Sequence, residues 1–158
     1  MTEQTSTLRP YVPTDAAATL RCFQRAVRDT ASRDYNPEQI ESWAAVDVEA
    51  WGRRRASTET WVADRDGQLV GFTDVNHDGY IDMMFVDPDV ARTGVASALL
   101  NNTIDLVRRR GGRELTVQAS ITARLFFERH GFSVTSEQRV ELRGSELTNY
   151  RMRRALHE

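Results

Sequence analysis

The sequence predicts a mixed α/β fold: a largely antiparallel sheet containing one parallel pair of strands, with helices on both faces. Two observations predict the antiparallel part. Residues 60–75 and 132–152 each contain two segments of alternating polarity joined by a tight turn, which is typical of a hairpin. A third predicts the parallel pair, since a strand, an amphipathic helix and another strand follow in order between them. The 158 residues suit one domain, expected over 1–158.

The chain is expected to begin with an edge strand and a long helix. Residues 8–11 form the strand, and a Pro-Thr-Asp cluster begins the helix with Thr14 or Asp15 as its cap. The apolar residues that then recur at helical spacing are Ala18, Leu20, Phe23, Ala26 and Val27.

A second helix and a hairpin follow. Asn36 is a suitable cap and Pro37 suits the first helical position. Residues 60–63 and 69–75 alternate in polarity as strands do, and the Asp66-Gly67 pair between them is a hairpin turn.

The second half of the chain carries the crossover. We expect a strand over 80–86, a helix over 95–110, a strand over 114–118 and a helix over 121–130. Glycines follow each of these helices, as is common at helix ends. A hairpin across Gly144 closes the chain and completes the sheet.

Composition excludes several functions. The net charge of −2 comes from 21 basic and 23 acidic residues that are intermixed, which gives no reason to expect nucleic acid or a membrane as a partner. The chain has no lysine, so it has no Walker lysine, pyridoxal Schiff base or lysine nucleophile. The lone Cys22, the polar start at 1–7 and the absence of a long apolar run favour a cytoplasmic location.

The most informative segment is 85–100, where an apolar strand runs through a Pro turn and a small-residue loop into a helix. Backbone N–H groups in the first turn of a helix have no intrahelical partner, and the helix dipole adds positive charge there. Gly94 and Ala96 leave room for a pyrophosphate on these donors, and Arg92 can add a bidentate cation. The loop fits neither a Walker sequence nor a dinucleotide fingerprint.

This segment resembles the acyl-CoA signature of the GNAT superfamily of N-acetyltransferases. Val86, Pro88, Gly94 and Ala96 fit the pattern, whereas Ala91 stands where the family has Gln or Arg, with an arginine directly after it. A second block at 119–132 resembles the family's aromatic pair followed by Gly-Phe. The order of elements also fits the GNAT fold, so the resemblance covers essentially the whole chain and indicates a bacterial subgroup.

The resemblance implies transfer of an acetyl group from acetyl-CoA to a primary amine of a small molecule or peptide, without a metal and with a homodimer as one option. In the GNAT fold the parallel strands splay, and the free edge of 84–86 pairs with the pantetheine arm. Ser120 stands where many relatives place an Asn on pantetheine. The residues expected to contact acetyl-CoA are Met84, Phe85, Val86, Arg92, Thr93, Gly94, Val95, Ala96, Ser97, Ser120 and Phe127.

Asp82 is the candidate general base. A carboxylate in an apolar central strand requires either a task or a partner. If 80–86 is one regular strand, one face presents Tyr80, Asp82, Met84 and Val86. The alternative is a structural ion pair with an arginine such as Arg113 or Arg139.

The general acid departs from the family pattern, because Phe127 replaces the usual Tyr and has no proton to give. The CoA thiolate can leave unaided, since a thiol pKa near ~8.5 makes it a tolerable leaving group. Tyr150 or Tyr80 can supply a proton from another strand. In the third alternative the protein is a non-catalytic acyl-CoA-binding or regulatory module.

Aromatic and polar residues are candidates for the amine side. Tyr35, Trp43, His77 and Tyr80 are the predicted substrate contacts, although aromatic residues there could equally belong to the core, as we expect for Trp51. Asp74, His77 and Asp78 are better explained by a hairpin turn than by a metal site. His130 is expected to cap a helix end.

Overall fold

The computed structural model describes residues 6–156, so 1–5 of the polar start lie outside it. The helices are α1 (Ala16–Asp29), α2 (Pro37–Ala44), α3 (Val48–Ser57), α4 (Val95–Arg109) and α5 (Ile121–Arg129), with 3-10 turns at Pro13–Asp15, Thr30–Arg33 and Pro88–Val90. The strands are β1 (Thr7–Pro10), β2 (Glu59–Arg65), β3 (Gln68–Val75), β4 (Tyr80–Ile81), β5 (Met84–Val86), β6 (Glu114–Ser120), β7 (Ser133–Leu142) and β8 (Ser145–Ala155).

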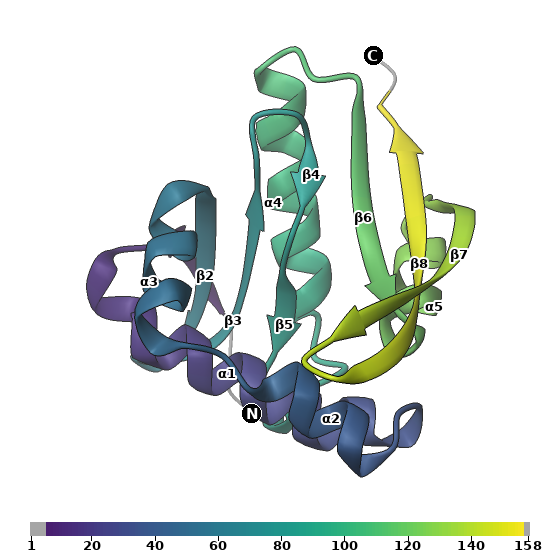
Figure 1. The fold of residues 1–158 in the computed structure, drawn as a ribbon. Helices are drawn as coiled ribbons and strands as arrows, with labels where there is room; N and C mark the ends of the chain where they lie inside the picture. The colour runs from purple at the N-terminus through teal and green to yellow at the C-terminus, as the bar shows by residue number, and fades with distance from the viewer. Residues whose placement is uncertain (1–5, 157–158) are drawn as a thin grey trace.

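The strands form two four-stranded sheets, in the orders β1-β2-β3-β5 and β4-β6-β8-β7 (Figure 1). All pairs are antiparallel except β4 with β6. The mixed sheet with one parallel pair is therefore confirmed, and so is the crossover through α4.

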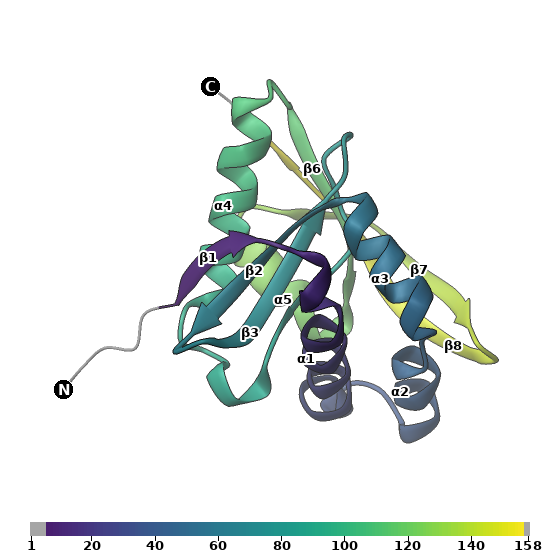
Figure 2. The ribbon, with the colours of Figure 1, turned by 90° about the vertical axis from the view of Figure 1, so that its left-hand side faces the viewer.

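Helices cover both faces (Figure 2). One face carries α1, α2 and α3 over a core that includes Phe23, Trp51 and Phe72. The other carries α4 and α5 over a core that includes Leu100 and Phe127. None of the helices within 6–156 is long and apolar enough to cross a bilayer.

The predicted continuous strand over 80–86 is wrong. Ile81 ends β4, which pairs with β6, whereas Met84 begins β5, which pairs with β3; Asp82 and Met83 belong to neither strand. The chain thus crosses from one sheet to the other at this break.

The break also overturns the predicted alternation of side chains. Asp82 contacts α3 and Met83 packs in the α1–α3 core, so two consecutive residues lie on one face. Beyond them, Met84 and Val86 pack on the α4 side and not on the face of Asp82.

The predicted helix ends agree closely with the structure, with one difference at α1. Asn36 and Gln39 form a reciprocal capping box at α2, with Pro37 at the first position. Asp15 precedes α1, but its carboxylate accepts the N–H of Val12 and two bonds from Arg9 and caps no α1 N–H.

Candidate active site

The two sheets separate where β5 and β6 diverge (Figure 1). β5 pairs with β3 alone, and the end of β6 from Gln118 to Ser120 pairs with β8 alone. Among the strands of 6–156, none occupies the second edge of Met84–Val86. Backbone groups on such an edge can accept an extended ligand in place of a strand.

The predicted cradle lies directly after β5. Arg92 and Gly94 have positive φ angles of 64° and 91°, which turn the loop sharply into α4. Ala98 N–H donates to Gly94 O at 3.0 Å, so the α4 ladder begins there. The N–H groups of Val95, Ala96 and Ser97 have no acceptor among the described residues, which leaves a set of donors at a helix N-terminus for an anion.

Side chains around the cradle are already engaged. Thr93 Oγ1 donates to Val90 O at 2.5 Å and accepts from Arg65 Nη2 at 3.2 Å. Ser97 Oγ lies 3.1 Å from Nε2 of His130, and Nδ1 of the same ring lies 2.9 Å from the carbonyl oxygen of Phe126. Arg92 is exposed. The backbone is therefore the better-prepared part of the cradle, and Arg65 is a neighbour that sequence reasoning missed.

Asp82 lies at the strand break, half-buried. Its Oδ2 accepts from Arg55 Nη2 at 3.1 Å and from Arg54 Nε at 3.4 Å. Within 6–156 no hydrogen bond reaches Oδ1. The ion-pair alternative is thus present, with partners on α3 and not Arg113 or Arg139, and it leaves one oxygen available.

Asp74 stabilises the strand break through its hydrogen bonds, and the sequence analysis did not identify it as a site residue. Its side chain is fully buried, and Oδ1 accepts the N–H groups of Asp82 and Met83 at 2.9 and 3.2 Å. Oδ2 accepts from buried Arg55 Nη1 at 2.5 Å. Burial raises the pKa of Asp74 to about 6, although the positive charge of Arg55 acts to lower it. No sequence pattern links Asp74 to Arg55, because they meet only in the fold.

The aromatic candidates fall into different places. Phe127 is 3% exposed and packs edge-on against Phe132, so its ring belongs to the core rather than to the cradle. Tyr150 packs on the α5 face under the Arg124 guanidinium, 4.5 Å from its ring centroid. Tyr80 is on the α3 face, where burial and the nearby carboxylates of Asp82 and Asp74 raise its pKa.

Ser120 lies at the point of divergence. It is the N-cap of α5, and its hydroxyl accepts the N–H of Ala123 at 3.1 Å. Its own O–H proton remains to be donated.

The predicted amine-side residues do not all come together. Tyr35 is buried, where its hydroxyl donates to Thr148 O and accepts from Ile121 N, so it joins segments of the fold. Trp43 is half-buried, with ring centroids 5.4 Å from Tyr35 and 6.1 Å from Phe85. Trp51 is in the core, as expected.

His77 is not brought to the site. It is exposed in the β3–β4 turn, beside a small cavity of about 150 Å³ formed with the end of α4 and the start of β6. Within 6–156 no group of three or more His, Cys, Asp or Glu side chains could hold a metal ion.

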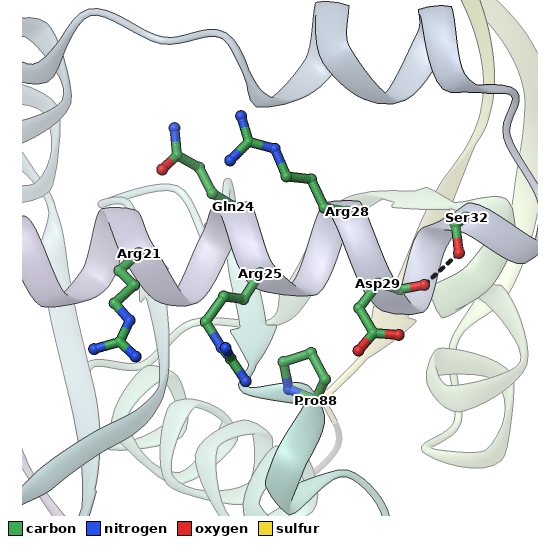
Figure 3. A pocket seen from close by; sticks show the side chains of 7 residues that line it. All are labelled: Arg21, Gln24, Arg25, Arg28, Asp29, Ser32 and Pro88. Atoms are coloured by element: carbon green, nitrogen blue, oxygen red, sulfur yellow. Dashed lines mark hydrogen bonds between the residues drawn. The ribbon is translucent and has the colours of Figure 1, made fainter.

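The larger cavity, about 430 Å³, lies elsewhere, on the outer face of α1 beside Pro88 (Figure 3). Its cations are mostly paired: Arg25 with Asp87 and Asp89, and Arg28 with Glu41. It contains none of the predicted site residues, so the divergent edge, the cradle and Asp82 define the candidate site.

Comparisons with known proteins agree with this geometry. Residues 31–154 match a family model described as an acetyltransferase (GNAT) domain. The chain is 48% identical over 147 residues to the uncharacterized N-acetyltransferase YafP of Escherichia coli K12, covering 92% of this chain and 93% of the relative. A GCN5-related N-acetyltransferase from Rhodopseudomonas palustris superposes with a TM-score of 0.94 at 34% identity, over 99% of both chains.

A more distant structure shares the fold. The PaiA N-acetyltransferase of Thermoplasma acidophilum, in complex with coenzyme A, has a TM-score of 0.74 at 17% identity, over 96% of this chain and 99% of that one.

Proposed function

Since the chain belongs to the GNAT family of acetyltransferases, we propose that it is a single-domain enzyme, over 1–158, that transfers the acetyl group of acetyl-CoA directly to a primary amine of a small molecule or peptide. The observation that carries this proposal is the unpaired edge of Met84–Val86, flanked by the cradle on one side and Asp82 on the other. Along the chain, a carboxylate, a strand edge for an extended arm and a set of N–H donors for an anion thus follow one another.

The residues divide the reaction into three tasks. The N–H groups of Val95, Ala96 and Ser97 hold the pyrophosphate. The edge of β5, with the Ser120 hydroxyl, orients the pantetheine arm and the thioester carbonyl. The thioester then lies beside the break that carries Asp82.

Acyl transfer requires that protons move in step with the bonds. The amine nitrogen forms the new C–N bond as the C–S bond breaks, and the electron pair of that bond goes to sulfur. Asp82 Oδ1 takes the proton that the nitrogen loses. We assign Tyr150 as the group that returns a proton to the thiolate, because Phe127 cannot do so.

The first test is CoA binding with a matched pair of glycine variants. Gly94 and Gly144 have φ angles of 91° and 87°, and a Cβ at either meets nothing within 4 Å. Gly94→Ala strains the cradle, which we expect to weaken acetyl-CoA binding about tenfold, whereas Gly144→Ala carries the same backbone strain in the β7–β8 turn. Calorimetry of both variants measures the difference.

Equal acetyl-CoA affinity in the two glycine variants contradicts the cradle. Thermal shifts of the wild type supply the wider test: stabilisation by acetyl-CoA and CoA but not by ATP is expected. A ligand at ~100 times its Kd stabilises by ~2.7 kcal/mol. No shift at millimolar acetyl-CoA contradicts the proposed function itself.

Tyr150→Phe tests the general acid. We expect kcat to fall roughly tenfold, less than the ~10²–10⁴-fold typical of a general acid, because a thiolate leaves tolerably without help. Tyr80→Phe is the comparison: its hydroxyl lies on the opposite face with the amine-side residues, so we expect KM for the amine to change more than kcat. Steady-state thiol release measures both, and an unchanged kcat in Tyr150→Phe removes Tyr150 from the mechanism.

A further inference from the structure

The acceptor side of the sheet carries a continuous row of polar side chains that the acetyl-transfer steps do not use. The row consists of Asp82, Gln118, Gln138, Asn149 and Arg151, and we call it the polar row. Tyr80 pairs with Thr116 across the parallel strands, and Gln118 pairs with Arg151 on β8. Side chains of paired residues lie on one face, so the register places Gln118 and Arg151 on the face of Tyr80, where Asp82 contacts α3.

Side-chain bonds fix the far end of the row. Gln138 Nε2 donates to Gln118 Oε1 at 3.0 Å, and its own Oε1 accepts from Arg151 Nε at 2.9 Å. The guanidinium of Arg151 is thus oriented through Nε alone. No carboxylate within 6–156 lies within 4.0 Å of it, whereas Arg153, two residues along the same face, is paired with Glu114. Neither terminal nitrogen of Arg151 has an acceptor among residues 6–156, so both can bind a ligand.

Two further observations point to a ligand on this face. Asn149 Oδ1 is buried and has no donor among the described residues, which is uncommon for a buried acceptor. The charge of Asp82 raises the pKa of Tyr80, whereas the charges of Arg54 and Arg151 lower it, so charges of both signs lie near this side chain. In the row and its α3 neighbours, Arg54, Arg55 and Arg151 outnumber Asp74 and Asp82, which disfavours an acceptor with two positive charges.

From this juxtaposition we infer that the acceptor is an amine that also carries a carboxylate: an amino acid or a short peptide. This inference rests on the proposed function. The amine lies at Asp82, and the carboxylate accepts two hydrogen bonds from Arg151. Strands are ~4.8 Å apart, so Asp82 and Arg151, two strands apart, are separated by roughly 10 Å at the backbone. Their side chains shorten that span to the reach of such a molecule.

The test compares matched acceptors: L-leucine, L-leucinamide, 3-methylbutylamine and the dipeptide Leu-Leu, each with acetyl-CoA. For the wild type we expect kcat/KM to be at least tenfold higher for leucine or Leu-Leu than for the amide and the decarboxylated amine. A preference for leucine over Leu-Leu indicates an amino acid as the acceptor, and the reverse preference indicates a peptide. Arg151→Gln removes the preference, so that kcat/KM for leucine falls to that for the amide in the same variant, and Arg153→Gln retains the preference.

Each outcome decides a different point. Turnover of the amide and the decarboxylated amine at the rate of the acids overturns this inference and leaves the transferase intact, as does an undiminished preference in Arg151→Gln. If acetyl-CoA binds but none of the four amines is acetylated, this inference fails; the proposed function fails only if acetyl-CoA itself does not bind.

Discussion

Asp82→Asn is expected to lower kcat by about 10²-fold or more, while the affinity for acetyl-CoA stays within about twofold of the wild type. Asn has nearly the size of Asp and its oxygen still accepts from Arg54 and Arg55, so the break between β4 and β5 keeps its contacts on α3. It cannot take the proton from the amine. The loss therefore falls on the chemical step and not on binding, and steady-state kinetics with calorimetry measures the two effects separately.

Two controls distinguish a base from a structural ion-pair partner. Asp78→Asn removes an exposed carboxylate from the β3–β4 turn and is expected to leave kcat unchanged. Arg54→Gln removes one of the two guanidinium contacts to Asp82 without removing its carboxylate, and kcat should fall much less than in Asp82→Asn. If Asp82→Asn retains kcat within threefold, or if it lowers kcat no more than Arg54→Gln, Asp82 serves only the ion pair.

The predicted cradle depends only on local patterns, because its small residues and its helix start are neighbours along the chain. In the structure Gly94 occupies the left-handed region at that helix start. The α2 capping box was equally readable, since Asn36 and Pro37 act within one turn. The family motifs added the order of elements, which the strand pairing follows.

The strand break could not be read from the chain, because its cause is not local. Period two holds only while a strand stays paired, and two N–H groups of 82–83 turn to Asp74 instead. The acceptor is eight residues from Asp82 and nine from Met83, on another strand. Asp74 is next to a predicted turn and Arg55 ends a run of three arginines at 53–55, yet they form a fully buried pair. His77 was predicted to contact the amine because it is close to Asp82 in the sequence. In the structure its turn precedes β4, whereas Asp82 follows β4.

Arg55→Met is expected to lower the free energy of unfolding by about 3–5 kcal/mol at pH 8, because it leaves the buried Asp74 carboxylate without its cation. Met fills a similar volume beside Trp51, so lost packing contributes little. Urea unfolding of the variant and the wild type, at pH 8 and at pH 5, measures the change.

The pH dependence of that loss identifies its cause. In the wild type burial already raises the pKa of Asp74 to about 6, and Arg55 opposes the rise. Without Arg55 the pKa rises further. A carboxyl with a higher pKa in the folded state binds its proton more tightly there, so stability increases as pH falls through that folded pKa. The variant gains more than the wild type on acidification, and its deficit should shrink between pH 8 and pH 5.

Arg55→Met combined with Asp74→Asn completes the test. The neutral Asn needs no cation, yet its oxygen still accepts the N–H groups of Asp82 and Met83. We expect this double variant to recover most of the stability at pH 8 and to lose the pH dependence. A deficit that is equal at both pH values, or that persists in the double variant, assigns the loss to packing around Trp51. Recovery instead assigns the loss to the buried Asp74 carboxylate that Arg55 neutralises in the wild type.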